Sequence, residues 1–243
     1  MSERKTILVL RENCDFSREL RRQGYQVLNL PVISTRPVRD LSHFRLLLNE
    51  IDRFAAIFIT SPAAAAVLAG EFNEAAYGKL PTIYVLGERA KKVLDEYGIS
   101  VEYRESANSA TELLDELGES GFAGKSILFL RGDRSMRTIP ERLGKVATVE
   151  EAVVYETVAV PIENDEAVGQ LQSGLVDWLC FFSPSAVESY SDRGFPLGVK
   201  AAAIGETTAT RARSLGFSVD FVSERASAID FANGLARHIE SFE

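Results

Sequence analysis

Two serine–proline pairs, Ser61-Pro62 and Ser183-Pro184, each follow a short apolar segment of the sequence. Serine is preferred at the residue before a helix and proline in its first turn, so each pair predicts a helix start. The free N–H groups and the positive dipole end at such a start bind anions well. Each serine therefore either caps its helix alone or also contacts an anionic ligand. Because the pair occurs twice, a ligand contacted by both helix starts is favoured.

Familiar catalytic and cofactor motifs are absent from the sequence. His43 and His238 are the only histidines, and neither belongs to a metal-ligand or nucleophile pattern. No glycine-rich dinucleotide or P-loop fingerprint is present. Cys14 and Cys180 are expected to be small buried hydrophobes in a reducing cytoplasm. Tyr155 lies in an unusually long extended segment. A tyrosine in such a segment is more often a half-buried strand residue than a catalytic acid.

The chain repeats itself at a spacing of about 120 residues, the length of one domain. Three pairs of segments resemble one another at nearly constant offset: Lys5–Arg11 with Lys125–Arg131 (125 − 5 = 120), Ile57–Pro62 with Leu179–Pro184 (179 − 57 = 122), and Val85–Glu88 with Ala203–Glu206 (203 − 85 = 118). The sequence therefore predicts two copies of one unit.

Each copy alternates short apolar runs with amphipathic segments. Continuous apolar runs are typical of strands buried on both faces of a parallel sheet: Lys5–Leu10, Ala55–Ile59, Thr82–Leu86, Ser126–Leu130, Asp177–Phe182 and Val199–Ile204. Helices are predicted at Ser17–Gln23, Ala63–Gly70, Arg89–Tyr97, Thr111–Gly118, Ala186–Asp192, Thr208–Leu215 and Ile229–Ile239. This alternation predicts a doubly wound parallel sheet in each copy.

In such a sheet, ligands bind outside the carboxyl ends of the strands. The residues expected there are Thr60–Pro62, Gly87-Glu88, Arg131-Gly132, Ser183–Ser185 and Gly205–Thr208. Ser109 and Ser227 precede two further predicted helices and have an acidic residue three positions later, so we interpret them as structural caps.

Two long extended segments break the alternation, at residues 27–37 and 148–161. The second is rich in β-branched residues. Both could cross between domains as a two-stranded connection, or both could be sheet strands that run long. The sequence favours neither alternative.

Composition and charge exclude several classes of protein. Lys plus Arg number 27 against 35 for Asp plus Glu, which gives a net charge of −8. This balance argues against nucleic-acid binding, which needs a dense basic surface. No apolar stretch approaches the roughly 18 residues of a membrane span. The amino-terminal residues do not resemble a secretory signal, so a cytoplasmic protein is expected.

Taken in order, several motifs resemble the uroporphyrinogen-III synthase family. The resemblance extends from Ile7 to about Leu235. The motifs that carry it are Phe58–Pro62 with Ala66-Val67, Leu130–Gly132, Val153–Thr157, Phe182–Val187 and Ala203–Ala209.

The resemblance implies an α/β fold of two flavodoxin-like, doubly wound parallel-sheet domains joined by a two-stranded linker. Residues 1–34 and 160–243 would form a discontinuous first domain, and residues 35–159 the second. The crossings would lie near residues 33–37 and 155–161. The internal repeat alone does not reveal this discontinuity.

The resemblance also implies an activity, that of a cyclising hydro-lyase in haem biosynthesis. Its substrate would be hydroxymethylbilane, a linear tetrapyrrole with eight carboxylates, and the reaction would invert ring D and release water. The family uses no cofactor or metal, and a monomer without nucleic-acid or membrane partners is expected. Tyr155 would be catalytic. Substrate binding would fall to Ser61, Arg131, Ser183, Ser185, Lys200, Gly205, Thr207 and Thr208.

One departure and one alternative accompany this interpretation. Ala90 stands where the family often has a threonine, which puts a side-chain contact from that helix in doubt. The alternative is a two-lobed cytoplasmic binding protein that closes on an anionic small molecule without chemistry. A phosphoacceptor regulator domain is disfavoured, because Leu10–Glu12 supplies no acidic cluster after the first strand.

Overall fold

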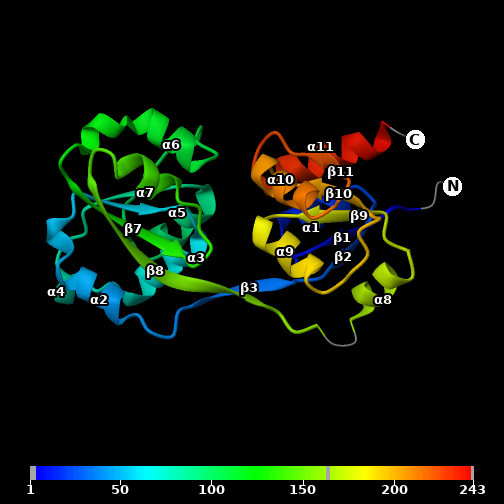
Figure 1. Cartoon of the computed structure of the whole chain (residues 1–243), viewed down its shortest axis with the longest axis horizontal. Helices are drawn as coiled ribbons and strands as arrows, with labels where there is room; N and C mark the ends of the chain where they lie inside the picture. Colours follow the sequence, from blue (N-terminus) through cyan, green and yellow to red (C-terminus); the bar gives the residue numbers. More distant parts are fainter. Residues whose placement is uncertain (1–3, 163–164, 242–243) are drawn as a thin grey trace. The chain divides into compact units, whose positions relative to one another are not determined.

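The computed structural model describes residues 4–162 and 165–241, and the chain forms two compact units. Unit 1 comprises Met1–Ser34 and Val158–Glu243, and unit 2 comprises Thr35–Thr157. Each unit is an α/β structure built on a parallel sheet (Figure 1), so the predicted fold class is confirmed.

Unit 1 contains a five-stranded parallel sheet of order β11-β10-β9-β1-β2. Its strands are β1 (Thr6–Val9), β2 (Gln26–Asn29), β9 (Trp178–Phe181), β10 (Lys200–Ala203) and β11 (Val219–Val222). Its helices are α1 (Asp15–Arg22), α8 (Glu166–Gln172), α9 (Pro184–Ser191), α10 (Glu206–Ser214) and α11 (Ala228–Glu240). Numbered along the chain, this is the 2-1-3-4-5 order of flavodoxin.

Unit 2 contains a six-stranded sheet of order β3-β8-β7-β4-β5-β6. Its strands are β3 (Ile33–Pro37), which begins in unit 1, β4 (Ala56–Ile59), β5 (Thr82–Val85), β6 (Glu102–Tyr103), β7 (Ser126–Gly132) and β8 (Thr148–Ala159), which ends there. Its helical segments are α2 (Ser42–Asn49), η1 (Ile51–Arg53), α3 (Pro62–Glu71), α4 (Glu74–Tyr77), α5 (Glu88–Asp95), α6 (Ala110–Leu117), η2 (Glu119–Phe122) and α7 (Thr138–Leu143).

Apolar residues cover both faces of each sheet, because successive side chains of a strand point to opposite faces. In β9, Leu179 and Phe181 belong to the core beside α8, α9 and α10, whereas Cys180 belongs to the core beside α1 and α11. In β7, Leu128 packs on the side of α2, α3 and α5, and Phe129 packs on the side of α6 and α7. Strands buried on both faces explain the continuous apolar runs of the sequence.

The two long extended segments of the sequence carry the chain between the units. β3 and β8 are neighbours in the sheet of unit 2, and the passages fall at residues 34/35 and 157/158. The two strands run antiparallel, since the Val38 N–H donates to the Val154 carbonyl and the Val160 N–H donates to the Val32 carbonyl. β8 is therefore both a sheet strand and a connection, and the two alternatives left open by the sequence hold together.

Side chains of α9 and the residues after it hold the chain where it leaves unit 1. The Ser189 hydroxyl donates to the Val32 carbonyl at 2.9 Å. Arg193 donates to the Val160 carbonyl at 2.6 Å and to that of Val32 at 3.1 Å. The Val32 carbonyl thus accepts from two side chains as well as from the Val160 N–H, and the Val160 carbonyl accepts from Arg193.

Candidate functional site

In unit 1, helices α9 and α10 begin directly after β9 and β10, which are neighbouring strands of the sheet. Ser183 is the N-cap of α9, and its hydroxyl oxygen accepts from the Ala186 N–H at 3.2 Å. Ser185 follows in the first turn and is half-buried. Gly205 is the N-cap of α10 and has extended backbone with φ −179°. These helix starts present N–H groups at the carboxyl edge of the sheet, where parallel α/β proteins bind ligands.

The two threonines of α10 differ in exposure. Thr207 is exposed, whereas Thr208 is 4% exposed and belongs to the buried side of the helix. Thr207 can therefore donate its hydroxyl to a ligand directly. Thr208 contributes chiefly its backbone N–H in the first turn of the helix.

In unit 2, Ser61 and Tyr155 lie at the corresponding carboxyl edge. Ser61 caps α3 and accepts from the Ala64 N–H at 3.2 Å, the same arrangement as Ser183. Tyr155 lies on β8, paired with Gly132 at the end of β7. Since β7 separates β8 from β4, the backbones of Tyr155 and the end of β4 are about two strand spacings, roughly 10 Å, apart.

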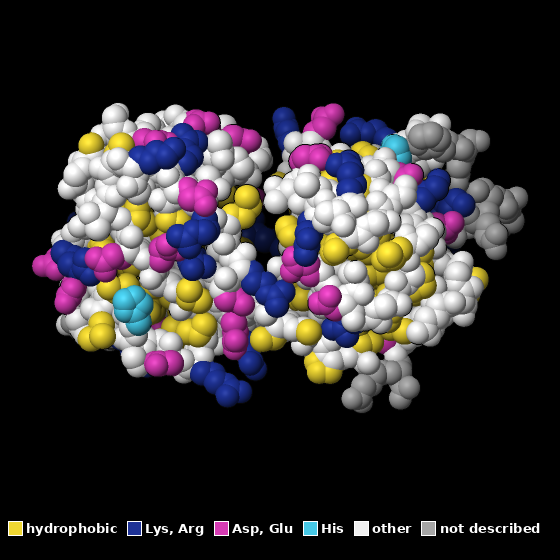
Figure 2. Space-filling model, in the orientation of Figure 1, with side chains coloured by type: hydrophobic (Ala, Val, Ile, Leu, Met, Phe, Trp, Pro, Cys, Tyr) yellow, Lys and Arg dark blue, Asp and Glu magenta, His cyan; other side chains and the backbone are white. Residues whose placement is uncertain are grey.

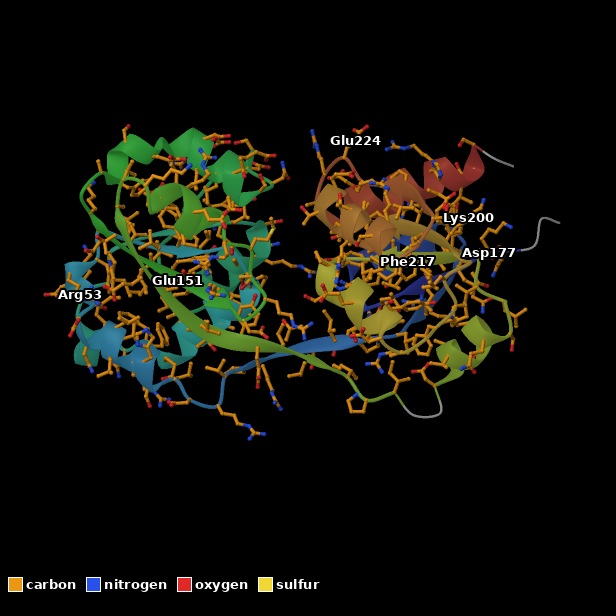
Figure 3. The ribbon with its side chains drawn as sticks, in the orientation of Figure 1. Arg53, Glu151, Asp177, Lys200, Phe217 and Glu224 are labelled. Atoms are coloured by element: carbon orange, nitrogen blue, oxygen red, sulfur yellow. The ribbon has the colours of Figure 1, made fainter. Side chains whose placement is uncertain are left out.

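Arg131 is committed to partners within unit 2. Its Nε lies 2.7 Å from Glu151 Oε2, although the two atoms are not oriented for a hydrogen bond. Its Nη1 donates to the Gly132 carbonyl at 2.9 Å. Glu151 also receives Arg137 at 3.0 Å, so one carboxylate serves two guanidinium groups (Figure 3 labels Glu151). Arg131 is therefore partly neutralised, and its side chain is 17% exposed.

Lys200 lies at the other edge of the sheet of unit 1. It is the first residue of β10, in register with Trp178 at the start of β9. Its Nζ lies 5.6 Å from the centre of the Trp178 ring (Figure 3 labels Lys200). The structure thus places Lys200 at the amino edge of the sheet, whereas Ser183, Gly205 and Thr207 lie at the carboxyl edge.

Arg11 is a residue that the sequence prediction omitted. It follows β1 at the carboxyl edge of unit 1, and its guanidinium carbon lies 4.7 Å from the centre of the Phe182 ring. Phe182 immediately precedes Ser183, so this half-buried cation stands beside the start of α9. The repeat contained the signal, because Arg11 is equivalent to Arg131 (131 − 11 = 120).

The cysteines are free and buried, as predicted. Burial in the core of unit 1 raises the pKa of the Cys180 thiol well above its ordinary value, which keeps it protonated and unreactive. Within residues 4–162 and 165–241, no three His, Cys, Asp or Glu side chains come together as a metal-binding set. No helix in this described part of the chain is long and apolar enough to cross a membrane.

Acidic and basic side chains are intermingled on the visible face of both units, without a broad basic field (Figure 2). Because the net charge is −8, attraction for an anion is expected from local donors, namely the helix starts and cations such as Arg11, rather than from the charge of the whole protein. The fold and these edges define a class of two-unit parallel α/β proteins, with hydroxyl-capped helix starts at the carboxyl edge of each sheet.

Within this class, the chain belongs to the uroporphyrinogen-III synthase family. The family model described as "Uroporphyrinogen-III synthase HemD" matches residues 15–232. The chain is 28% identical, over 250 aligned residues, to the uroporphyrinogen-III synthase of Chlorobaculum parvum (strain DSM 263 / NCIMB 8327). That alignment covers 97% of this chain and all of the relative.

Two solved structures share the fold along nearly the whole chain. The uroporphyrinogen-III synthetase of Helicobacter pylori 26695 has a TM-score of 0.63 at 20% identity and covers 98% of this chain and 100% of its own. A mutant uroporphyrinogen III synthase from the thermophilic bacterium Thermus thermophilus has a TM-score of 0.62 at 18% identity, covering 98% and 99%. At these identities the structures establish the fold and not the site.

Proposed function

We propose that this protein converts hydroxymethylbilane into uroporphyrinogen III, closing the ring with inversion of ring D and release of one water. The family match over residues 15–232 carries this proposal. It is a hydro-lyase reaction of tetrapyrrole biosynthesis. The residues at the two carboxyl edges support the proposal, because the substrate is a polyanion and both edges present hydroxyl and N–H hydrogen-bond donors.

Recognition of the substrate carboxylates falls to the helix starts. The Ser61 and Ser183 oxygens accept from their own helices, which leaves each hydroxyl proton to donate to a carboxylate. Gly205 and Thr207 add donors at the start of α10, and Arg11 adds a positive charge beside Phe182. Charge-assisted bonds of this kind are stronger than neutral ones.

The proposed chemistry begins with loss of the hydroxyl from the methylene carbon on ring A. The Tyr155 O–H donates to this hydroxyl as the C–O bond breaks, so that it leaves as water. The resulting azafulvenium cation is attacked by the substituted α-carbon of ring D, which forms a C–C bond to the methylene carbon of ring A and gives a spiro intermediate. The bond from that ring D carbon to the methylene carbon of ring C then breaks, and the freed methylene carbon bonds to the other α-carbon of ring D. Loss of the proton on this second carbon restores the pyrrole, closes the macrocycle and returns a proton to Tyr155.

Positioning supplies much of the rate enhancement in this scheme. The linear tetrapyrrole must be held in one curved conformation so that rings A and D meet. Holding the reacting groups in this way can lower the activation barrier by several kcal/mol. Arg131 is a secondary contributor because Glu151 already neutralises it. Lys200 has no part in the proposal, since it lies at the amino edge of unit 1.

The decisive experiment incubates purified protein with hydroxymethylbilane and separates the type III from the type I isomer. Type I forms spontaneously, so enzymatic formation of type III is the expected result. If only type I accumulates at the uncatalysed rate, the proposal fails. Tight binding of the tetrapyrrole without turnover would instead support the two-lobed binding protein.

A further inference from the structure

An irregularity in β8 determines which face of the sheet Tyr155 occupies. β7 and β8 pair residue by residue up to Arg131 with Val153, and then Gly132 pairs with Tyr155. β8 therefore contains one extra residue, a β-bulge, at this point. A shift by one residue moves a side chain to the opposite face of a sheet.

The bulge places Tyr155 on the face covered by α3. Leu130 and Ala152 belong to the core on that face, which also contains the buried residues of α3, and Tyr155 packs against the same core. Without the bulge, Tyr155 would lie on the same face of the sheet as Val153, opposite to the face of Leu130. The tyrosine thus shares a face with the helix that Ser61 caps.

Gly132 leaves the space that the Tyr155 ring occupies. A Cβ atom added to Gly132 would lie 2.7 Å from the Tyr155 hydroxyl oxygen and 2.5 Å from ring carbon Cε2. Real Cβ atoms do not make contacts this short, so any side chain at position 132 would displace the ring. The absence of a side chain at Gly132 is therefore a condition for the observed position of Tyr155.

Asp133 holds the backbone of β8 at Tyr155 and two residues beyond it. Its N–H donates to the Tyr155 carbonyl at 3.1 Å, and its carboxylate Oδ1 accepts from the Thr157 N–H at 2.9 Å. The turn itself is held by Ser135, whose hydroxyl oxygen accepts from the Gly132 N–H at 2.9 Å. These bonds join the end of β7 to the bulged part of β8.

We propose that Gly132 and Asp133 are positioning residues for Tyr155, and that the turn they begin holds the phenol at the carboxyl edge of unit 2. This inference rests on the proposed function, in which Tyr155 donates to the departing hydroxyl. Gly132 leaves room for the ring, and Asp133 keeps the bulge in register. Neither residue has to contact the substrate.

The test is a double-mutant cycle with Tyr155→Phe. Gly132→Ala is expected to lower kcat at least about tenfold in the wild-type background, with KM within about twofold, and to have no further effect on Tyr155→Phe. Gly121→Ala is the control, because Gly121 has no neighbour within 4 Å of an added Cβ and no positive φ. Equal slowing of both backgrounds, or wild-type kcat in Gly132→Ala, would overturn the proposal.

Asp133 offers a second, independent test if Gly132→Ala fails to fold. Asp133→Ala should lower kcat, whereas Asp133→Asn should retain it, since the amide oxygen can still accept from Thr157. Loss of kcat in both Asp133 variants, or in neither, would contradict the role assigned to the side chain.

A spectroscopic readout separates this proposal from the proposed function. The Cζ resonance of ¹³C-labelled Tyr155, assigned by its loss in Tyr155→Phe, should shift in Gly132→Ala and not in Gly121→Ala. An unshifted resonance would refute the positioning role. If the wild-type protein forms no type III isomer, the proposed function fails, while this measurement still decides the role of Gly132.

Discussion

Units 1 and 2 place equivalent strands at the same positions of their sheets, although the chain visits them in different orders. Strands β11-β10-β9-β1-β2 of unit 1 correspond to β6-β5-β4-β7-β8 of unit 2. When these five strands of unit 2 are numbered in chain order, their order in the sheet is 3-2-1-4-5. This order is a circular permutation of the flavodoxin order of unit 1. Close packing of the repeated strands, rather than the path of the connections, thus determines the architecture.

The carboxyl edges of the two units have diverged within this common architecture. Gly205 is extended at the start of α10, whereas its equivalent Gly87 has a φ of +86° at the start of α5. Thr207 is replaced in unit 2 by Arg89. Tyr155 stands beyond the point where the equivalent strand β2 of unit 1 has already ended. We infer that the edge of unit 1 chiefly recognises substrate and that of unit 2 supplies the proton donor.

The largest expected effect separates the two equivalent glycines. Gly87→Ala should lower the free energy of unfolding by about 2 kcal/mol, because only glycine adopts its backbone conformation readily. Gly205→Ala should change it by less than about 1 kcal/mol but raise KM, since the new methyl group lies at the ligand edge. Urea denaturation and steady-state kinetics measure both. Equal destabilisation by the two changes would contradict the comparison.

Tyr155→Phe should slow turnover at least about tenfold, roughly 1.4 kcal/mol of barrier. The matched control lies in unit 1, where the buried Tyr190 hydroxyl donates to the Pro196 carbonyl at 2.7 Å. Tyr190→Phe should cost about 1 kcal/mol of stability and leave kcat unchanged. Unchanged turnover in Tyr155→Phe would remove this tyrosine from the mechanism.

The serine caps should behave alike in stability. Ser61→Ala and Ser183→Ala should each cost about 1 kcal/mol, while substitution by glycine costs only a few tenths. In the glycine variants a raised KM would then report lost substrate contact. Ser109→Gly is the control, because Ser109 accepts from the Glu112 N–H at 3.1 Å and is assigned no ligand. A KM that rises equally in all three glycine variants would argue against a specific contact.

The smallest effect concerns acid stability. Hydrogen bonds from the Arg53 guanidinium lower the pKa of Glu150, at the start of β8. A lowered folded-state pKa stabilises the protein above the ordinary Glu value and loses this effect as the pH falls through the lowered value. The free energy of unfolding of the wild type should therefore exceed that of Glu150→Gln by less than about 1 kcal/mol at pH 7, because the Arg53–Glu150 pair is partly exposed.

The pH at which this advantage disappears can be checked against unit 1. A hydrogen bond from Arg22 lowers the pKa of Glu19 to about 2, so the advantage of wild type over Glu19→Gln should decline as the pH falls below the ordinary Glu value and be lost near pH 2. Denaturation curves between pH 2 and 7 measure both pairs. A Glu150→Gln difference that grows as the pH falls would contradict the assigned sign.

The sequence by itself determined the elements, the repeat and the capped helix starts. Short apolar runs became the predicted strands, and Ser61 and Ser183 cap the predicted helices. These features depend on residues within one turn or one strand of each other, so local patterns suffice to predict them. Helices α2, α4, α7 and α8 and strands β6 and β11 were missed.

Only the tertiary structure decided which candidate residues share an edge. Lys200 begins its strand and so lies away from Ser183, and Glu151 neutralises Arg131 through the pairing of β7 with β8. The bulge that turns Tyr155 toward the face of α3 likewise depends on the register between two strands. Register and strand order arise from contacts between distant segments, and for this reason the spacing of residues along the chain does not disclose them.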